Sequence, residues 1–340
     1  MVTENNNYQL AGLPYSVLDL ATVKEGNVPA DTYRDSLELA QHVEALGYTR
    51  YWLAEHHNMI SVASSATSVV IGHIAAGTTK LRVGSGGIML PNHSPLVIAE
   101  QFGTLASLFP GRIDLGLGRA PGSDQVTALA IRGERFNAAN EFPQDILKLQ
   151  RYFSPENSGA RVRAIPGEGL NIPLYILGSS TDSAYLAAAM GLPYAFASHF
   201  APAQFLNAIN IYRQNFKPSA QLLKPYVISC VNVVAADTDE EATRLATSLQ
   251  QMFVGVITGK PRLLPPPVDN IDDVWSEYEA ETVNQMLLCS FIGGPETLAL
   301  EFKHFMKQTQ VDEIIVTSNI FDQEAKRYSY QLFAEMINNN

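Results

Sequence analysis

The chain has 340 residues, of which 46% are hydrophobic and 17% charged, and its formal net charge is −11. This length and balance predict a folded globular protein with a large core. The acidic excess argues against nucleic acid or an anionic membrane surface as a partner, and the most apolar stretch, 184–197, is broken by Gly191 and Pro193 and too short to span a bilayer.

Strand-like and helix-like segments alternate along the chain. Strands are predicted at 15–20, 49–54, 81–90, 112–117, 173–177, 194–198, 226–235 and 313–317. Helices are predicted at 31–47, 64–77, 95–109, 140–152, 181–191, 202–216, 239–253 and 322–337. Eight strands, each followed by a helix, predict that residues 1–340 form a single α/β domain, a (β/α)8 TIM barrel. A doubly wound open sheet is the alternative, which the strand count and the closing strand–helix pair disfavour.

Residues 255–281 interrupt this alternation before the eighth strand. The segment has low hydrophobicity, consecutive prolines at 265–267 and several acidic residues between 269 and 279. Loops of this length in a compact domain are usually lids or disordered segments. We therefore expect an insertion at this point that serves as a lid.

The N-terminus and the cysteines indicate the cellular compartment. Residues 1–10 are polar and rich in Asn, without the basic start and apolar core of a secretory signal. Cys230 and Cys289 are too few for a disulfide framework, and the strand-like surroundings of Cys230 predict a buried, inert thiol. Together these features favour a reducing cytoplasm.

The second predicted strand ends in Glu55-His56-His57, a carboxylate followed by two imidazoles. All strands of a barrel end at one mouth, where reaction sites are built, and histidine exchanges protons near neutral pH. The alternative is that the two histidines only cap or pair within a loop. A metal site is disfavoured, because adjacent strand residues point to opposite faces and no third ligand follows at a typical spacing.

Glycines recur in the next two predicted strands. Gly86 and Gly87 lie in the third strand, where missing side chains either let a planar ring lie against the barrel wall or only mark a bulge. In the fourth, Gly116-x-Gly118-x-x-x-Gly122 has the wrong spacing for a dinucleotide fingerprint, and no helix follows at once. The chain thus gives no sign of a nicotinamide-binding domain of its own.

A candidate anion site follows the fifth predicted strand, where Gly178-Ser179-Ser180 opens a helix. Exposed amides and the helix dipole favour a phosphate there, although a simple serine N-cap explains the same residues. Arg119, at the end of the neighbouring strand, can pair with a phosphate through two parallel bonds. Its alternative is a salt bridge with Asp114 or Asp124.

Four segments, in the same order along the chain, resemble the bacterial-luciferase-like flavin-dependent monooxygenases. They are residues 51–57, 83–91, 111–119 and 175–180. The resemblance covers nearly the whole chain and is closest to the single-chain luciferase-like oxidoreductases. It implies the same barrel, usually dimeric through its early helices, with FMN as cofactor and a mobile lid at 255–281.

The resemblance also assigns roles to residues near the flavin ring. His56 matches the catalytic imidazole that assists the oxygen chemistry of the flavin. Gly86 and Gly87 match a pair joined by an unusual cis peptide beneath the isoalloxazine. These roles agree with the proton chemistry and the open barrel wall expected from the residues themselves.

At the phosphate, the resemblance matches Arg119 to the binding arginine and Ser179, with the amide of Ser180, to the rest of the site. Gly118 stands where the light-emitting enzyme has a cysteine, and Asp182 where it has a threonine. Because an acid beside a phosphate is unfavourable, Asp182 is expected to turn away and a neighbouring hydroxyl to take its place. These departures argue against light emission and not against flavin binding.

Together these features predict a two-component monooxygenase. A separate flavin reductase supplies reduced FMN, which the protein uses with O2 to oxygenate a small organic substrate, for example an aldehyde. The alternatives are hydride transfer with a deazaflavin, for whose longer tail no extra basic patch is present, and flavin binding without catalysis, which the Glu55-His56-His57 strand end disfavours. Candidate pocket residues, equally suited to ordinary core or loop positions, are Asp19, Met59, His199 and Phe200.

Overall fold

The central feature of the computed structural model, which describes residues 9–133 and 138–339, is one sheet of nine parallel strands. Its order is β6-β5-β4-β3-β2-β1-β9-β7-β8, and an additional pairing of β6 with β7 closes all but β8 into a barrel. The barrel strands are β1 (Tyr15–Asp19), β2 (Arg50–Leu53), β3 (Arg82–Met89), β4 (Ile113–Gly118), β5 (Leu174–Gly178), β6 (Tyr194–Phe196), β7 (Val227–Ala235) and β9 (Glu313–Thr317). The predicted (β/α)8 barrel is confirmed.

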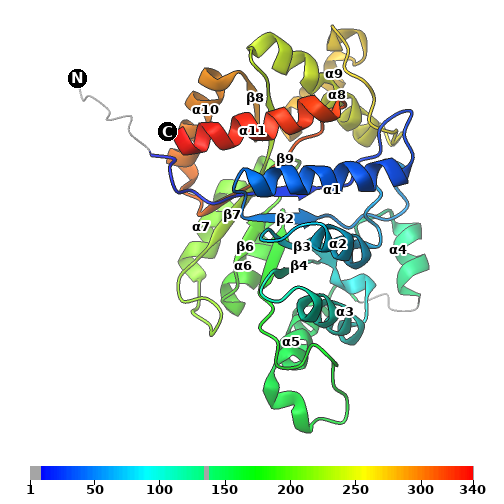
Figure 1. Ribbon diagram of the computed structural model, residues 1–340, viewed down its shortest axis with the longest axis vertical. Helices are drawn as coiled ribbons and strands as arrows, with labels where there is room; N and C mark the ends of the chain where they lie inside the picture. Colours follow the sequence, from blue (N-terminus) through cyan, green and yellow to red (C-terminus); the bar gives the residue numbers. More distant parts are fainter. Residues whose placement is uncertain (1–8, 134–137, 340) are drawn as a thin grey trace.

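Helices surround the barrel (Figure 1). They are α1 (Pro29–Ala45), α2 (Thr67–Ala76), α3 (Pro95–Leu108), α4 (Gln125–Arg132), α5 (Phe142–Phe153), α6 (Thr181–Met190), α7 (Phe205–Asn215), α8 (Asp239–Ile257), α9 (Glu277–Met286), α10 (Pro295–Thr309) and α11 (Gln323–Asn339). Helices α1 and α11, from opposite ends of the chain, lie side by side and complete the ring. Across the parts of the chain that the structure describes, no helix is both long and apolar enough to cross a bilayer.

The sequence prediction passed over the segment between the insertion and the last barrel strand. It contains β8 (Ser290–Gly293), which pairs with the second half of β7, and α10. Four residues are too few to show the alternation of a strand, so β8 had no clear local signal. Helix α10 did have one, because Leu298, Phe302 and Met306 recur at helical spacing and are buried.

The predicted insertion at 255–281 lies before the last barrel strand, as expected, but it contains helical segments and is not a simple loop. Helix α8 continues to Ile257, a 3₁₀ turn covers Ile271–Asp273, and α9 begins at Glu277. Ser276 caps α9 by accepting a hydrogen bond from the amide of Glu279, whose carboxylate accepts one in return. Helix α9 therefore begins within the insertion, at a capping signal that the insertion itself contains.

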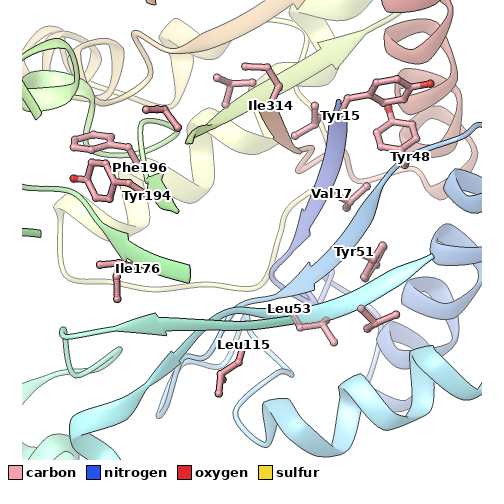
Figure 2. Close-up of a cluster of buried hydrophobic side chains, with 14 of the residues drawn as sticks. Tyr15, Val17, Tyr48, Tyr51, Leu53, Leu115, Ile176, Tyr194, Phe196 and Ile314 are labelled. Atoms are coloured by element: carbon pink, nitrogen blue, oxygen red, sulfur yellow. The ribbon is translucent and has the colours of Figure 1, made fainter. Parts of the chain in front are cut away.

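Two apolar layers follow from the alternation of side chains along the strands. Outward-facing residues such as Val17 and Ile176 pack beneath the helices in the largest core cluster, parts of which Figure 2 shows on strands around the ring. Their inward-facing neighbours, including Leu18 and Tyr175, form a second cluster that fills the barrel with Trp52. The expected burial of the Cys230 thiol is confirmed, and this thiol belongs to the inner cluster.

An ion-pair network lies inside the barrel at the N-terminal ends of the strands. The Arg50 guanidinium donates to both carboxylate oxygens of Glu313 at 2.8 and 3.1 Å, to Asp114 at 2.8 Å and to the Tyr175 hydroxyl at 2.7 Å. Burial disfavours the cation and lowers the pKa of Arg50, but the two carboxylates outweigh burial and raise it. The permanently charged guanidinium of Arg50, together with that of Arg82, which also pairs with Asp114, therefore balances the two carboxylates at the floor of the barrel.

Replacing Arg50 by alanine leaves Glu313 and Asp114 buried without this partner. We expect Arg50→Ala to lower the free energy of unfolding by about 3–5 kcal/mol, the usual consequence of breaking a buried pair on one side. Urea denaturation measures the change. The control is Arg244→Ala, which removes a guanidinium paired with Glu241 on the surface, where the side chains are 41% and 46% exposed, and should barely shift the midpoint. Equal shifts in the two variants would show that the Arg50 network does not stabilise the barrel.

Candidate functional site

A cavity of about 380 Å³ opens at the C-terminal ends of the barrel strands. Most of the residues singled out in the sequence line it, namely His56, Gly86, Arg119, Gly178, Ser179 and Ser180. Gly87 follows Gly86 on β3 and contacts β4 behind the cavity wall. Residues from four strand ends are thus brought to one space, as a barrel mouth requires.

Bare backbone forms the cavity wall at β3. The Gly86–Gly87 peptide bond is cis, as the resemblance implies, and the β3–β4 register shifts between Ser85 and Ile88, so that a bulge is present as well. A Cβ on Gly86 would lie 2.6 Å from the Leu18 side chain, and one on Gly87 would lie 2.7 Å from a backbone oxygen of β4. A side chain at Gly87 would therefore force the backbone of β4 to move, whereas one at Gly86 would have to displace the Leu18 side chain.

The turn after β5 leaves polar groups at the start of α6. Ser180 is the N-cap residue, but its side chain makes no capping hydrogen bond. The Ser183 hydroxyl instead donates to the Ser180 carbonyl at 2.6 Å and lies 2.9 Å from the Tyr194 hydroxyl. The simple serine cap is thus not what the structure shows, and Ser179 and Ser180 keep their hydroxyls for another partner.

Arg119 lies beside this helix start and pairs with Asp182, with 3.4 Å between Nη2 and Oδ2. Both side chains are at least half exposed, so the pair is weak. The alternative partners are wrong, because Asp114 is engaged with Arg50, and Asp124 caps α4. The expectation that Asp182 turns away is also wrong, since the second position of α6 holds its carboxylate at the same rim. A more highly charged anion would have to displace it.

His56 lines the cavity from the end of β2. Its Nδ1 lies 3.3 Å from the Gly122 carbonyl, which can only accept, so this nitrogen carries the hydrogen. Burial lowers the pKa of His56 below the ordinary 6.5. In the resulting neutral ring, Nε2 has no hydrogen and can accept a proton.

Glu55 and His57, which flank His56 after the end of β2, form a separate hydrogen-bonded cluster with His93. The buried Glu55 carboxylate accepts from His57 Nε2 at 2.7 Å, from His93 Nε2 at 2.8 Å and from the Met89 amide at 3.1 Å. Burial raises the pKa of Glu55, but these hydrogen bonds outweigh burial and bring it to about 2. Glu55 is therefore ionised at neutral pH and orients both imidazoles.

The same three side chains also place three potential metal-ligand atoms within 4.8 Å of one another. Ligand atoms around tetrahedral zinc lie roughly 3.3 Å apart, given bonds of about 2.0–2.1 Å. The Glu55–His57 and Glu55–His93 separations of 2.7 and 2.8 Å are shorter and match hydrogen bonds. The cluster is arranged as a hydrogen-bonded carboxylate rather than as a metal cage.

Of the further pocket candidates, Met59, His199 and Phe200 line the cavity. The His199 side chain is 9% exposed, and its Nδ1 has no hydrogen-bond partner among the residues described. Burial, with a smaller contribution from the nearby His56, lowers the pKa of His199 to about 3 and keeps this ring neutral. Asp19 does not line the cavity; its carboxylate accepts from Ser36 and other groups behind β1.

One wall of the cavity was anticipated only in part, because three of its residues lie in the predicted insertion at 255–281 and the other three were not singled out. It comes from α8, the segment that follows it and α9, and consists of Met252, Phe253, Val256, Pro261, Arg262 and Met286. Its outer members lie beyond residue 253, where the sequence reading ended the helix. Val256 continues the apolar spacing from Phe253 and could have extended it.

Comparison with known proteins relates nearly the whole chain to one family. The model of the luciferase-like monooxygenase family matches residues 13–313. A luciferase-like monooxygenase of Escherichia coli K12 is 51% identical over 94% of this chain and 96% of its own length. An N-acetyl-S-alkylcysteine monooxygenase of Bacillus subtilis is 30% identical, over 95% and 97% of the two chains. The crystal structure of apo-MsnO8 superposes with a TM-score of 0.85 at 34% identity, covering 95% of this chain and 98% of that one.

The depressed pKa of Glu55 makes a prediction for stability against pH. Its pKa of about 2 lies below the ordinary 4.5, so the ionised carboxylate stabilises the fold above pH 4.5, and this contribution is lost as the pH falls towards 2. Glu55→Gln should therefore cost up to about 3 kcal/mol near pH 6, with the difference from the unaltered protein shrinking steadily below pH 4.5. Urea unfolding at several pH values measures it. A difference that stays constant down to pH 2 would contradict this role.

Proposed function

We propose, because the chain belongs to the family of luciferase-like monooxygenases, that this oxidoreductase uses reduced FMN and O2 to oxygenate a small organic substrate. One observation carries the proposal. A single cavity joins an imidazole with an accepting nitrogen, a wall of bare backbone and a cationic helix start. These three features suit proton transfer, a flat ring and a phosphate respectively.

The residues present fit FMN at both of its ends. Arg119 and the Ser179-Ser180 turn would hold the phosphate, since a dianion outcompetes the exposed carboxylate of Asp182 for the guanidinium. The ring would lie against Gly86, where a Cβ would collide with the barrel interior. When bound, FMN supplies the electrons and the reaction with O2.

The chain itself contributes proton transfer and exclusion of water. Nε2 of His56 is the accepting atom, and the Gly122 carbonyl fixes the ring through Nδ1. The apolar wall of Met252, Phe253 and Met286 closes one side of the cavity, which strengthens the polar interactions inside it. His56 would then take or return a proton without competition from bulk solvent.

Reduced FMN would come from a separate reductase. The barrel, its insertion and its outer helices account for the elements in the described part of the chain. The proposed substrates to test are an aldehyde and a thioether, the latter because one relative is named for its action on an N-acetyl-S-alkylcysteine. Oxygen uptake with reduced FMN should rise when a true substrate is added.

A pair of variants separates chemistry from cofactor binding. His56→Ala should lower substrate-dependent oxygen uptake by about 10²–10⁴-fold, the usual contribution of acid–base catalysis, and leave FMN affinity unchanged. Arg119→Ala should do the reverse, weakening FMN binding by roughly tenfold or more while turnover at saturating FMN persists. Fluorescence titration and an oxygen electrode measure the two effects. Full turnover in His56→Ala would remove this imidazole from the mechanism.

We also propose a homodimer formed through α2 and α3. Val69 on α2 is 72% exposed, and Val97 and Leu108 on α3 are 44% and 65% exposed. The two helices pack closely, with a Cβ on Gly72 lying 3.4 Å from Leu105. Exposed apolar side chains on two neighbouring helices are typical of an interface.

Placing a charge on this surface tests the dimer. Val69→Arg should yield monomers in analytical ultracentrifugation, because the interface would bury an unpaired guanidinium. The matched control is Val126→Arg, which alters a valine of similar exposure (77%) on α4. A native protein that is already monomeric, or a Val69→Arg variant that remains dimeric, would show that α2 and α3 do not form the interface.

A further inference from the structure

The cavity wall is basic although the chain is acidic. Arg119, Arg262, His56 and His199 line it, and no aspartate or glutamate does so within the described residues, against a formal net charge of −11 for the whole chain. We propose that the substrate is an organic anion, a molecule with a short apolar body and a carboxylate that Arg262 binds. The inference rests on the proposed function, because it takes the phosphate of FMN to occupy Arg119.

Of the four basic side chains in the cavity wall, only the two arginines carry a permanent positive charge. Burial lowers the pKa of both histidines, to about 3 for His199, so both rings are neutral at neutral pH. Arg119 and Arg262 therefore supply the positive charge of the wall. A cofactor phosphate accounts for Arg119, and Arg262 remains for a second anion.

The backbone around Arg262 is fixed to the barrel mouth. The Leu264 amide donates to the Val23 carbonyl at 2.9 Å, and the Glu25 amide donates to the Leu264 carbonyl at 2.8 Å. The stem of Arg262 packs on the last turns of α8, 3.7 Å from where a Cβ on Gly255 would lie. These contacts hold the guanidinium at the rim of the cavity.

The guanidinium has capacity for a further anion. Its Nη2 donates to Glu25 at 2.8 Å, in a pair whose side chains are 43% and 41% exposed. This is one of five N–H groups on an arginine, and ion pairs of such exposure are weak. A ligand carboxylate can therefore bind through two parallel bonds or displace Glu25.

Apolar side chains surround the space next to Arg262. Met252, Phe253, Val256 and Met286 come from α8 and α9, and Phe200 lines the same cavity. Methionine adapts to ligands of irregular shape, so the wall accepts an apolar chain without fixing its form. His56 and Gly86 lie on other strands of the same cavity. A ligand held at Arg262 would extend its apolar body towards them.

The test compares an anion with its neutral isostere on the FMN-loaded protein. Hexanoate and hexanamide have the same apolar chain and differ in charge, and calorimetry measures the dissociation constant of each. The variants are R262Q, R262K and the control R244Q. Arg244 forms a similar pair with Glu241, at 2.8 Å and with side chains 41% and 46% exposed, on the same helix but not in the cavity wall.

We expect hexanoate to bind the native protein about tenfold more tightly than hexanamide, the factor that one charge-assisted hydrogen bond gives. This preference should fall to about one in R262Q, persist in part in R262K and remain unchanged in R244Q, with FMN affinity equal in all four proteins. Equal binding of the two probes, no binding of either, or a preference that survives in R262Q would overturn the inference.

Failure of the proposed function gives a different result. A chain that does not bind FMN contradicts the flavin proposal, and the same titration is then made without cofactor, with R119Q added. Loss of the hexanoate preference in R262Q alone would still assign the anion to Arg262. Loss in R119Q alone would place the anion at the helix start and overturn the assignment.

Discussion

The site depends on one buried charge, the carboxylate of Glu55 at the end of β2. The carboxylate accepts a hydrogen bond from the backbone amide of Met89 on β3. It also accepts hydrogen bonds from two imidazoles, those of His57 after β2 and His93 after β3. A buried carboxylate is tolerated only when such donors satisfy it. Because the three donors come from two strand ends, satisfying the charge also fixes these ends relative to each other.

Gly122 transmits this order to the rest of the site. Its carbonyl accepts from the His56 ring and from the His57 amide, and a Cβ on it would lie 2.8 Å from the Glu55 carbonyl oxygen. Its φ of +66° is also one that other residues rarely adopt. The loop after β4 that carries Arg119 thereby packs against the segment after β2 that carries His56. The backbone of Gly122 thus links the side of the cavity that holds Arg119 to the side that holds His56. A short motif after one strand therefore does not form the site without the motif after the other.

Features that the sequence revealed are local, and those that it did not reveal depend on contacts between distant segments. The barrel strands and the Glu55-His56-His57 strand end follow from short apolar runs and from the rule that parallel strands end at one mouth. Arg119 pairs with Asp182 at the start of α6 rather than with Asp114, because Asp114 lies at the opposite, N-terminal end of β4 in the network of Arg50. The cavity wall from α8 and α9 likewise arises only when the insertion folds back over the barrel. Charge partners and packing of this kind have no periodic signature.

The charge of the cavity is separate from that of the barrel floor. The floor pairs two guanidiniums with two carboxylates, those of Arg50, Arg82, Asp114 and Glu313. Since these formal charges cancel, the floor adds little net field at the mouth, and the rings of Trp52 and Tyr175 stack edge to face between the two levels, 4.9 Å apart. The two guanidiniums in the cavity wall, Arg119 and Arg262, also have carboxylate partners, Asp182 and Glu25, but both pairs are exposed to solvent and therefore weak. A chain with a large negative net charge would attract an anion only through such local donors, and under the proposed function the position of these two guanidiniums would set where anions bind.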